Sequence, residues 1–262
     1  MNRVKRCCRQ GLENLGFSLR IGIAIIVAIF YYVPAFAGHP MITDDTGTQG
    51  KEKYLLELNS GFVIEGQDTG SGMLAALTWG IANNIDLGIE FPYQWSPVKG
   101  KCDIPVEVKW RILDCDENGL SLALKPGFSI PSGDEKKGLG NGAVTAGLLV
   151  IVTKEWKHGA VHSNLGYTRD AYGLKSDSDV FRKDIWHASI ATEINLTENL
   201  RSVFDAGIDT NSDKTSNVHP VYLIGGLIHS ATENVDIDFG VKLGLNQPVS
   251  NTMFLCGLTM NL

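Results

Sequence analysis

Apolar and polar residues alternate without interruption between residues 235 and 246, which read V-D-I-D-F-G-V-K-L-G-L-N. A repeat of two residues places neighbouring side chains on opposite faces of an extended chain, so this pattern predicts a β-strand. The segment is close to the roughly 9 to 11 residues with which a tilted strand crosses a bilayer. Its polar face carries Asp236, Asp238 and Lys242, which is unusual for a soluble sheet.

Similar segments recur from residue 54 to the end of the sequence. Short turns such as Asn83-Asn84 separate some of them, whereas long links rich in glycine and polar residues separate others. A two-residue joint rich in asparagine is typical of a tight hairpin turn. We expect twelve strands, at residues 54–64, 73–82, 85–95, 104–113, 120–130, 143–153, 160–169, 186–196, 200–210, 221–231, 235–246 and 252–262.

The regular alternation of short turns and long links indicates the architecture. Bacterial outer-membrane barrels have an even number of strands, short periplasmic turns and longer outer loops. We therefore predict an all-β protein in which residues 52–262 form an antiparallel up-and-down transmembrane β-barrel of about twelve strands. A soluble β-sandwich is the alternative, but it would seldom place Lys109, Glu193 and Asp205 in the middle of strands on one common face.

Aromatic residues cluster near the strand ends at which the long links begin. Tyr93, Trp95, Phe128, Tyr167 and Trp186 all lie at such positions. Tyrosine and tryptophan are enriched where a membrane protein meets the lipid–water interface. The placement is typical of an interfacial aromatic girdle.

The first 37 residues have the composition of a secretory signal peptide. Five basic residues precede an uncharged apolar run at residues 21–33, and Ala35-Phe36-Ala37 provides small residues for signal peptidase. This run is too short for a membrane-spanning helix. We expect cleavage after Ala37 and export to the outer membrane, with an uncleaved anchor as the alternative.

The charge of the mature chain narrows the possible partners. After residue 37 there are 18 Lys and Arg against 28 Asp and Glu, a net charge of −10, so we expect no nucleic-acid binding. The cysteines show no metal-ligand spacing. The acidic pairs Asp44-Asp45 and Asp134-Glu135 lie in polar, glycine-rich segments and are interpreted as solvated loop acids. We expect no metal and no cofactor.

Residues 38–51 contain neither the strand nor the helix pattern. The segment is polar and rich in glycine. We expect an N-terminal periplasmic arm that is either free or inserted as a plug into something hollow. The candidate plug residues are Thr43, Asp44, Asp45, Thr46 and Gln49.

Several motifs resemble those of a known family. They include T-D-D-T-G-T-Q-G-K at 43–51, N-I-D-L at 84–87, P-S-G-D-E-K-K-G-L-G at 131–140 and L-G-Y-T-R at 165–169. In these motifs the sequence resembles the outer-membrane proteins named for the meta-pathway of phenol degradation. The resemblance implies a channel-like protein that transports hydrophobic or aromatic compounds. One departure is the ending Met260-Asn261-Leu262, where such barrels usually finish on an aromatic residue that the insertion machinery reads.

If the apolar faces contact lipid, the polar faces line the lumen. The expected lumen-lining residues are Glu57, Asp86, Glu90, Glu107, Lys109, Arg111, Lys125, His162, His187, Glu193, Arg201, Asp205, Asp209, Asp236, Asp238 and Lys242. One hypothesis is a mildly cation-favouring pore in which rings of charge set selectivity. The other is that these groups pair across the wall and fill a narrow lumen, because small barrels are packed with side chains.

Three of the expected strands alternate poorly. On 73–82, 143–153 and 221–231, apolar side chains are expected to face inward, and they are Leu74, Leu149, Ile151, Ile224 and Ile228, beside Tyr222. An apolar inner stripe suits an apolar solute. It could equally be the surface against which the arm packs, or an error in the assigned phase.

An enzyme is also considered, because twelve-stranded outer-membrane phospholipases with a Ser-His-Asn site exist. His162 and Ser163 are consecutive and therefore point to opposite faces. His187 and Ser189 share a face but lie about 6.6 Å apart along a strand, which predicts no hydrogen bond between them. We therefore expect no catalytic residues.

The combined prediction is a passive outer-membrane channel or transporter for small, hydrophobic or aromatic molecules. Its expected partners are outer-membrane lipid, a small-molecule solute and the barrel-assembly machinery. The alternatives are a structural or adhesion-type barrel whose outer loops carry the function and, further removed, a membrane-embedded lipid hydrolase.

Overall fold

The computed structural model describes residues 38–65, 68–115, 117–246 and 251–262. The expected signal peptide, residues 1–37, lies outside the described residues. Within the described ranges, no helix is both long enough and apolar enough to cross a membrane.

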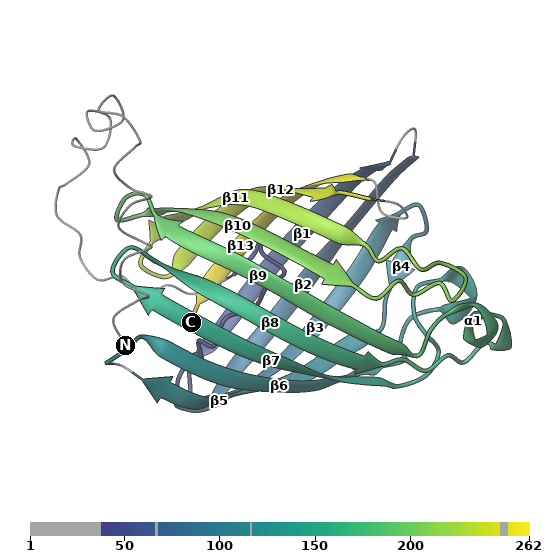
Figure 1. The fold of residues 1–262 in the computed structure, drawn as a ribbon, viewed down its shortest axis with the longest axis horizontal. Helices are drawn as coiled ribbons and strands as arrows, with labels where there is room; N and C mark the ends of the chain where they lie inside the picture. Colours follow the sequence, from purple (N-terminus) through teal and green to yellow (C-terminus); the bar gives the residue numbers. More distant parts are fainter. Residues whose placement is uncertain (1–37, 66–67, 116, 247–250) are drawn as a thin grey trace, which may run out of the picture. The chain divides into compact units, whose positions relative to one another are not determined.

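The predicted twelve-stranded antiparallel barrel is confirmed (Figure 1). Each long strand pairs with its neighbour along the chain, and β1 pairs with both β2 and β13, which closes the ring. The long strands are β1 (Tyr54–Glu65), β2 (Asp68–Ala82), β3 (Ile85–Ser96), β5 (Ile104–Cys115), β6 (Leu120–Ile130), β7 (Thr145–Trp156), β8 (Gly159–Arg169), β9 (Asp184–Asn195), β10 (Leu200–Asp209), β11 (Val221–Thr232), β12 (Val235–Gly244) and β13 (Thr252–Asn261).

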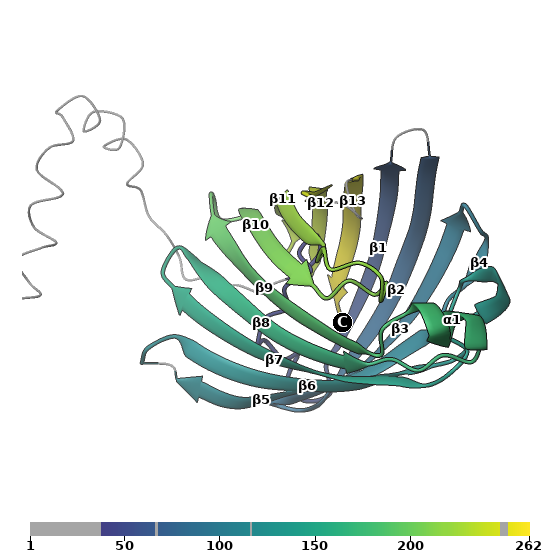
Figure 2. The ribbon, with the colours of Figure 1, turned by 45° about the vertical axis from the view of Figure 1, so that its right-hand side comes forward.

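The long links carry three small elements, and Figure 2 shows β4 and α1 at the same end of the barrel. They are β4 (Gly100–Lys101), which pairs with β3, the 3-10 helix η2 (Glu135–Lys137) and the helix α1 (Lys175–Val180). The short turns lie at the opposite ends of the strands. This asymmetry agrees with the expected long outer loops and short periplasmic turns.

One predicted link is wrong in part, because β2 begins at Asp68 rather than at residue 73. The ladder with β1 continues through Gly61↔Gly72 to Glu65↔Asp68. Backbone groups form the ladder, so a run of small residues can extend a strand when a partner strand is in reach. The result is a long β1–β2 hairpin, in which residues 68–72 of β2 read D-T-G-S-G.

The outward faces of the strands form an apolar surface. Phe91, Phe204, Leu227 and Phe239 are among the large apolar side chains that are exposed there. Such a continuous apolar surface would be unfavourable in water but matches the hydrocarbon core of a bilayer. The protein is therefore an outer-membrane barrel, in which these side chains contact lipid.

Aromatic pairs lie at both ends of this apolar surface. The Tyr167 and Trp186 rings are 4.8 Å apart at the loop end. Tyr54 stacks on Trp79, with ring centroids 6.3 Å apart, at the turn end. Girdles of this kind mark the two interfaces of a bilayer, so the strands span the membrane along most of their length.

Candidate channel lumen

Residues 38–50 form no strand and lie against the inner wall of the barrel, where β10 holds them through one carboxylate. Asp205 Oδ2 accepts hydrogen bonds from the backbone N–H groups of Ile42 (2.7 Å) and Thr43 (2.9 Å). Asp205 Oδ1 accepts a third bond from the Thr43 hydroxyl at 2.6 Å. Three hydrogen bonds to one buried carboxylate fix the position of this part of the arm.

Asp44 makes the principal ionic contact of the arm. Its carboxylate accepts hydrogen bonds from Lys109 Nζ at 2.8 Å and from Lys125 Nζ at 3.0 Å. Burial alone would raise the pKa of Asp44, but the two ammonium groups outweigh that effect and hold the pKa below its usual range. Removing one partner of such a buried pair typically costs about 3 to 5 kcal/mol, because the other charge is left unpaired.

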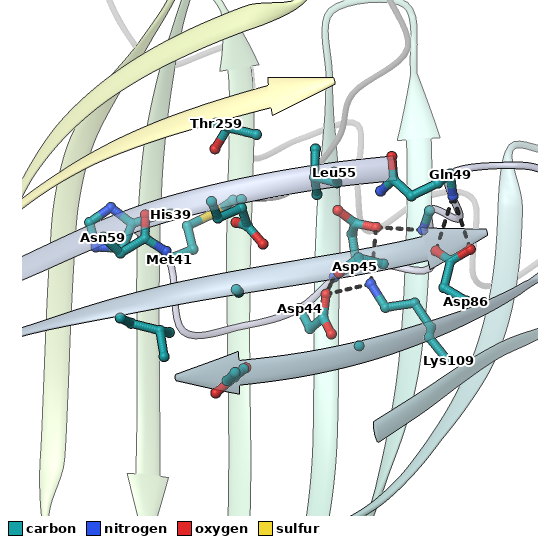
Figure 3. Close-up of a pocket in the computed structure, with 18 of the residues that line it drawn as sticks. His39, Met41, Asp44, Asp45, Gln49, Leu55, Asn59, Asp86, Lys109 and Thr259 are labelled. Atoms are coloured by element: carbon teal, nitrogen blue, oxygen red, sulfur yellow. Dashed lines mark hydrogen bonds and ion pairs between the residues drawn. The ribbon is translucent and has the colours of Figure 1, made fainter. Parts of the chain in front are cut away.

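The end of the arm nearest β1 is bound through its backbone (Figure 3). The Thr46 N–H donates to Thr153 Oγ1 at 3.1 Å, and the Gln49 N–H donates to Asp86 Oδ2 at 3.0 Å. The Thr46 hydroxyl also pairs with the Ser121 hydroxyl. The arm thus contacts strands on several sides of the lumen.

The first residues of the arm pack against the barrel wall through apolar contacts. Pro40 is fully buried, and a Cβ atom on either Gly226 or Gly240 would lie within 2.7 Å of its ring. These two glycines of β11 and β12 therefore leave the space that Pro40 fills. Met41 packs against the buried side chains of Val203 and Ile228.

The structure places the expected plug residues inside the barrel. Thr43, Asp45 and Thr46 are at most 4% exposed. The interpretation of Asp44-Asp45 as solvated loop acids is therefore wrong, because Lys109 lies 2.8 Å from Asp44 and 3.9 Å from Asp45. Asp134, in contrast, lies in an outer loop and caps η2 through the Lys136 N–H.

Many of the expected lumen residues lie close to one another. Glu107 pairs with Lys125 at 2.5 Å, and Arg201 lies 3.4 Å from Glu193 and also pairs with Asp236. Glu107, Lys125, Arg201 and Asp236 line a charged chamber of about 420 Å³ beside the arm. The expected lumen residues that line this chamber are Glu57, Asp86, Glu90, Glu107, Lys109, Lys125, Arg201, Asp236 and Asp238.

The other expected lumen residues have separate contacts. Arg111 pairs with Asp114 at 3.2 Å near the turn end. His162 is fully buried, with its Nδ1 3.0 Å from Thr153 Oγ1. Lys242 Nζ lies 4.7 Å from the centre of the Tyr222 ring.

The expectation that His187 and Ser189 cannot interact is wrong. His187 Nε2 lies 2.9 Å from Ser189 Oγ, and His187 Nδ1 lies 2.7 Å from Asp209 Oδ1. Residues two apart share a face, and the long imidazole ring spans most of the distance between their Cα atoms. The distance between Cα atoms was therefore the wrong criterion.

A second, larger chamber of about 910 Å³ lies nearer the loop end, between β1, β2, β3 and β13. It contacts the charged chamber, since His39, Asn59 and Leu74 line both. Its apolar lining residues include Val63, Met73, Leu74, Pro92, Met253 and Leu255.

Met253 and Leu255 were not predicted to face the lumen, because apolar residues were assigned to lipid and polar residues to the lumen. A detectable signal was present, because residues 252–260 read T-M-F-L-C-G-L-T-M and are apolar on both faces of the strand. The expected inner stripe was found, since Ile151, Ile224 and Ile228 are at most 3% exposed.

Among the described side chains, no group of three or more His, Cys, Asp or Glu has an arrangement that could hold a metal ion. The charged chamber contains acids and bases in contact with each other. Its chemistry is that of paired charges rather than of a ligand set for a cation.

Comparison with solved structures places the fold among outer-membrane channels. The NanC porin has a TM-score of 0.63 and 12% identity, covering 79% of this chain and 100% of that one. An outer-membrane channel from Pseudomonas putida F1 has a TM-score of 0.64 and 9% identity, covering 83% and 98%. The KdgM porin in complex with disordered oligogalacturonate has a TM-score of 0.55 and 11% identity, covering 79% and 98%. These three are channels or porins rather than enzymes, and at these identities they show the fold.

Comparison with curated proteins found no match. A family profile, in contrast, covers the whole barrel together with most of the arm. The profile described as "Putative MetA-pathway of phenol degradation" matches residues 43–262, and the chain belongs to that family.

Proposed function

We propose that the protein is a passive outer-membrane channel for small apolar molecules, aromatic compounds included. The observation that carries this proposal is the apolar chamber of about 910 Å³ near the loop end of the barrel. Ligand sites for small molecules are typically concave, mostly apolar and roughly 300 to 1,000 Å³ in volume. The family to which the chain belongs, named for phenol degradation, supports the same class of solute.

We further propose that residues 38–51 act as a plug after a signal peptide, residues 1–37, has been removed. Below the apolar chamber, the arm and its ionic contacts occupy the lumen. Asp44, Lys109 and Lys125 would have to separate before a straight path could open there. A hydrated solute therefore meets a closed path, which favours the paired-charge hypothesis over a cation-selective pore.

The wall beside the apolar chamber offers another route. A cavity of about 430 Å³ on the lipid side is lined by Phe62, Trp95, Phe239 and Phe254. Both cavities are also lined by Gly61, Gly72 and Leu255. Four of the seven residues that line both cavities are serine or glycine of the β1–β2 hairpin, namely Ser60, Gly61, Ser71 and Gly72. We therefore propose that apolar solutes leave sideways into the membrane at this hairpin.

The proposal is tested with purified protein in lipid vesicles. Met253→Asn places an amide in the apolar chamber, and we expect the influx of toluene or indole to fall about tenfold, because an unpaired buried amide costs about 1 to 3 kcal/mol. Thr259→Asn, on the same strand and face but lining the charged chamber, is the matched control and should leave influx unchanged. Equal influx in vesicles with and without the wild-type protein would refute the channel.

A further inference from the structure

Three polar side chains on the inner wall form a continuous hydrogen-bonded relay. Asp209 Oδ1 lies 2.7 Å from His187 Nδ1, and His187 Nε2 lies 2.9 Å from Ser189 Oγ. Because a carboxylate only accepts hydrogen bonds, Nδ1 of the neutral ring carries the proton, and Nε2 is left to accept the serine proton. These atoms occur in the order that a Ser-His-Asp nucleophile requires.

The strand register produces this relay. Asp209 of β10 lies directly opposite His187 of β9, and Gly207 lies opposite both Ser189 and Tyr222 of β11. Alternation puts all of these positions on the inner face. The relay is therefore built on paired strands of the barrel wall rather than on a loop.

A fourth group completes the arrangement. The Tyr222 side chain is 3% exposed, and its hydroxyl lies beside the Ser189 and Thr43 hydroxyls without a well-formed hydrogen bond to any described residue. A Cβ atom on Gly207 would lie 2.4 Å from this hydroxyl, so only glycine lets the phenol ring cross β10 towards Ser189. A buried, unpartnered O–H at this place can donate to an oxygen anion formed next to Ser189.

The surroundings indicate the class of substrate. Tyr222 belongs to an apolar cluster with Ile224 and Leu255, against which Met253 packs. Met253 and Leu255 also line the apolar chamber. The apolar cluster therefore connects this chamber with Tyr222, which lies beside the relay.

We propose that Ser189 and His187 hydrolyse small carboxylic esters that have an apolar acyl or alkyl group. Ser189 Oγ attacks the ester carbonyl while His187 Nε2 takes the hydroxyl proton, and Tyr222 donates to the resulting oxyanion. His187 then protonates the departing alkoxide, which leaves as the alcohol. Water, deprotonated by His187, attacks the acyl-serine and releases the carboxylic acid and the free serine. Asp209 is a positioning residue that holds the imidazole in its tautomer.

The experiment uses the purified barrel in detergent with p-nitrophenyl butyrate and a fluorophosphonate probe. We expect steady hydrolysis and labelling of Ser189 in the wild type, and a loss of hydrolysis of about a thousandfold in Ser189→Ala. Ser202→Ala is the matched control, because Ser202 has the same exposed fraction of 9% on the neighbouring strand. A heat-dependent gel shift verifies that each variant is folded.

The variant Asp209→Asn tests whether Asp209 holds the tautomer of His187 or has only a structural role. We expect kcat to fall at least about a hundredfold with KM unchanged, because the imidazole loses its tautomer control. No labelling of the folded wild type, or labelling and hydrolysis that survive Ser189→Ala, would overturn the proposal. Toluene influx is measured after the same protein has been reconstituted into lipid vesicles, so a failure of hydrolysis is distinguished from a failure of the channel.

Discussion

At the scale of single residues, depth in the membrane decides what a side chain can be. Phe239 lies in the middle of β12, is 55% exposed on the outer face and pairs with Leu227 and Cys256 on the neighbouring strands. Its neighbour Asp238 points the other way and lies 2.5 Å from His39 of the arm. Two residues that are adjacent in the strand thus have different surroundings, lipid for one and the lumen for the other.

Phe239→Arg should destabilise the folded barrel by about 2 to 4 kcal/mol, because a guanidinium near the bilayer midplane is poorly solvated. The measurement is urea-dependent folding into lipid vesicles. Trp95→Arg, near the loop-side interface, is the control and should cost at most about 1 kcal/mol. Equal costs for the two variants would contradict the assignment of Phe239 to the hydrocarbon region.

At the scale of elements, the arm and the wall fit each other. Asp205 holds the backbone of the arm, Asp44 joins Lys109 and Lys125, and two glycines make room for Pro40. None of these contacts closes the barrel itself. The arm can therefore be removed without breaking any strand pairing.

Deletion of residues 41–50 should leave a folded barrel with a larger ionic conductance, because the charged chamber is then open to water. Planar-bilayer recording of the purified protein measures this directly, and a several-fold increase in the conductance step is expected. Restoring the deleted residues as a synthetic peptide should lower the conductance again. An unchanged step in the deleted protein would show that the arm does not occlude the lumen.

At the scale of the whole molecule, the two chambers suggest separate routes for ions and for apolar molecules. In the proposed arrangement, ions must pass the arm in the charged chamber, whereas apolar molecules leave the apolar chamber sideways towards lipid at the β1–β2 hairpin. Changes in the wall should therefore affect one kind of transport and not the other.

Gly61→Val places a side chain between the apolar chamber and the lipid-side cavity, which Gly61 lines jointly. A Cβ atom at this position would lie 3.3 Å from Sδ of the flexible Met253 side chain. We expect toluene influx to fall about tenfold, as for an obstruction that costs about 1.4 kcal/mol, while ionic conductance stays the same. Gly225→Val is the control, because the nearest atoms there belong to Phe204 at 4.0 Å. A parallel loss of conductance and influx in Gly61→Val would argue for one shared path and against the sideways route.

The sequence by itself determined the number of strands, the class of barrel and, for the strands that alternate regularly, which side chains face inward and which outward. Residues 235–246 illustrate why, since a period of two is a local property that survives in any sheet and tells which side chains share a face. The alternation of turn and link lengths then defines which strand ends face the periplasm and which face outward.

Only the tertiary structure decided which inward groups meet. Asp44 is 65 residues from Lys109 and 81 from Lys125 along the chain, and the relay of Asp209, His187 and Ser189 depends on the register between β9 and β10. Contacts across a lumen follow from strand tilt and register, which a local pattern does not contain. The position of the arm could not be predicted from the sequence for the same reason. Its residues show no periodic pattern, and its partners lie on strands distributed around the barrel.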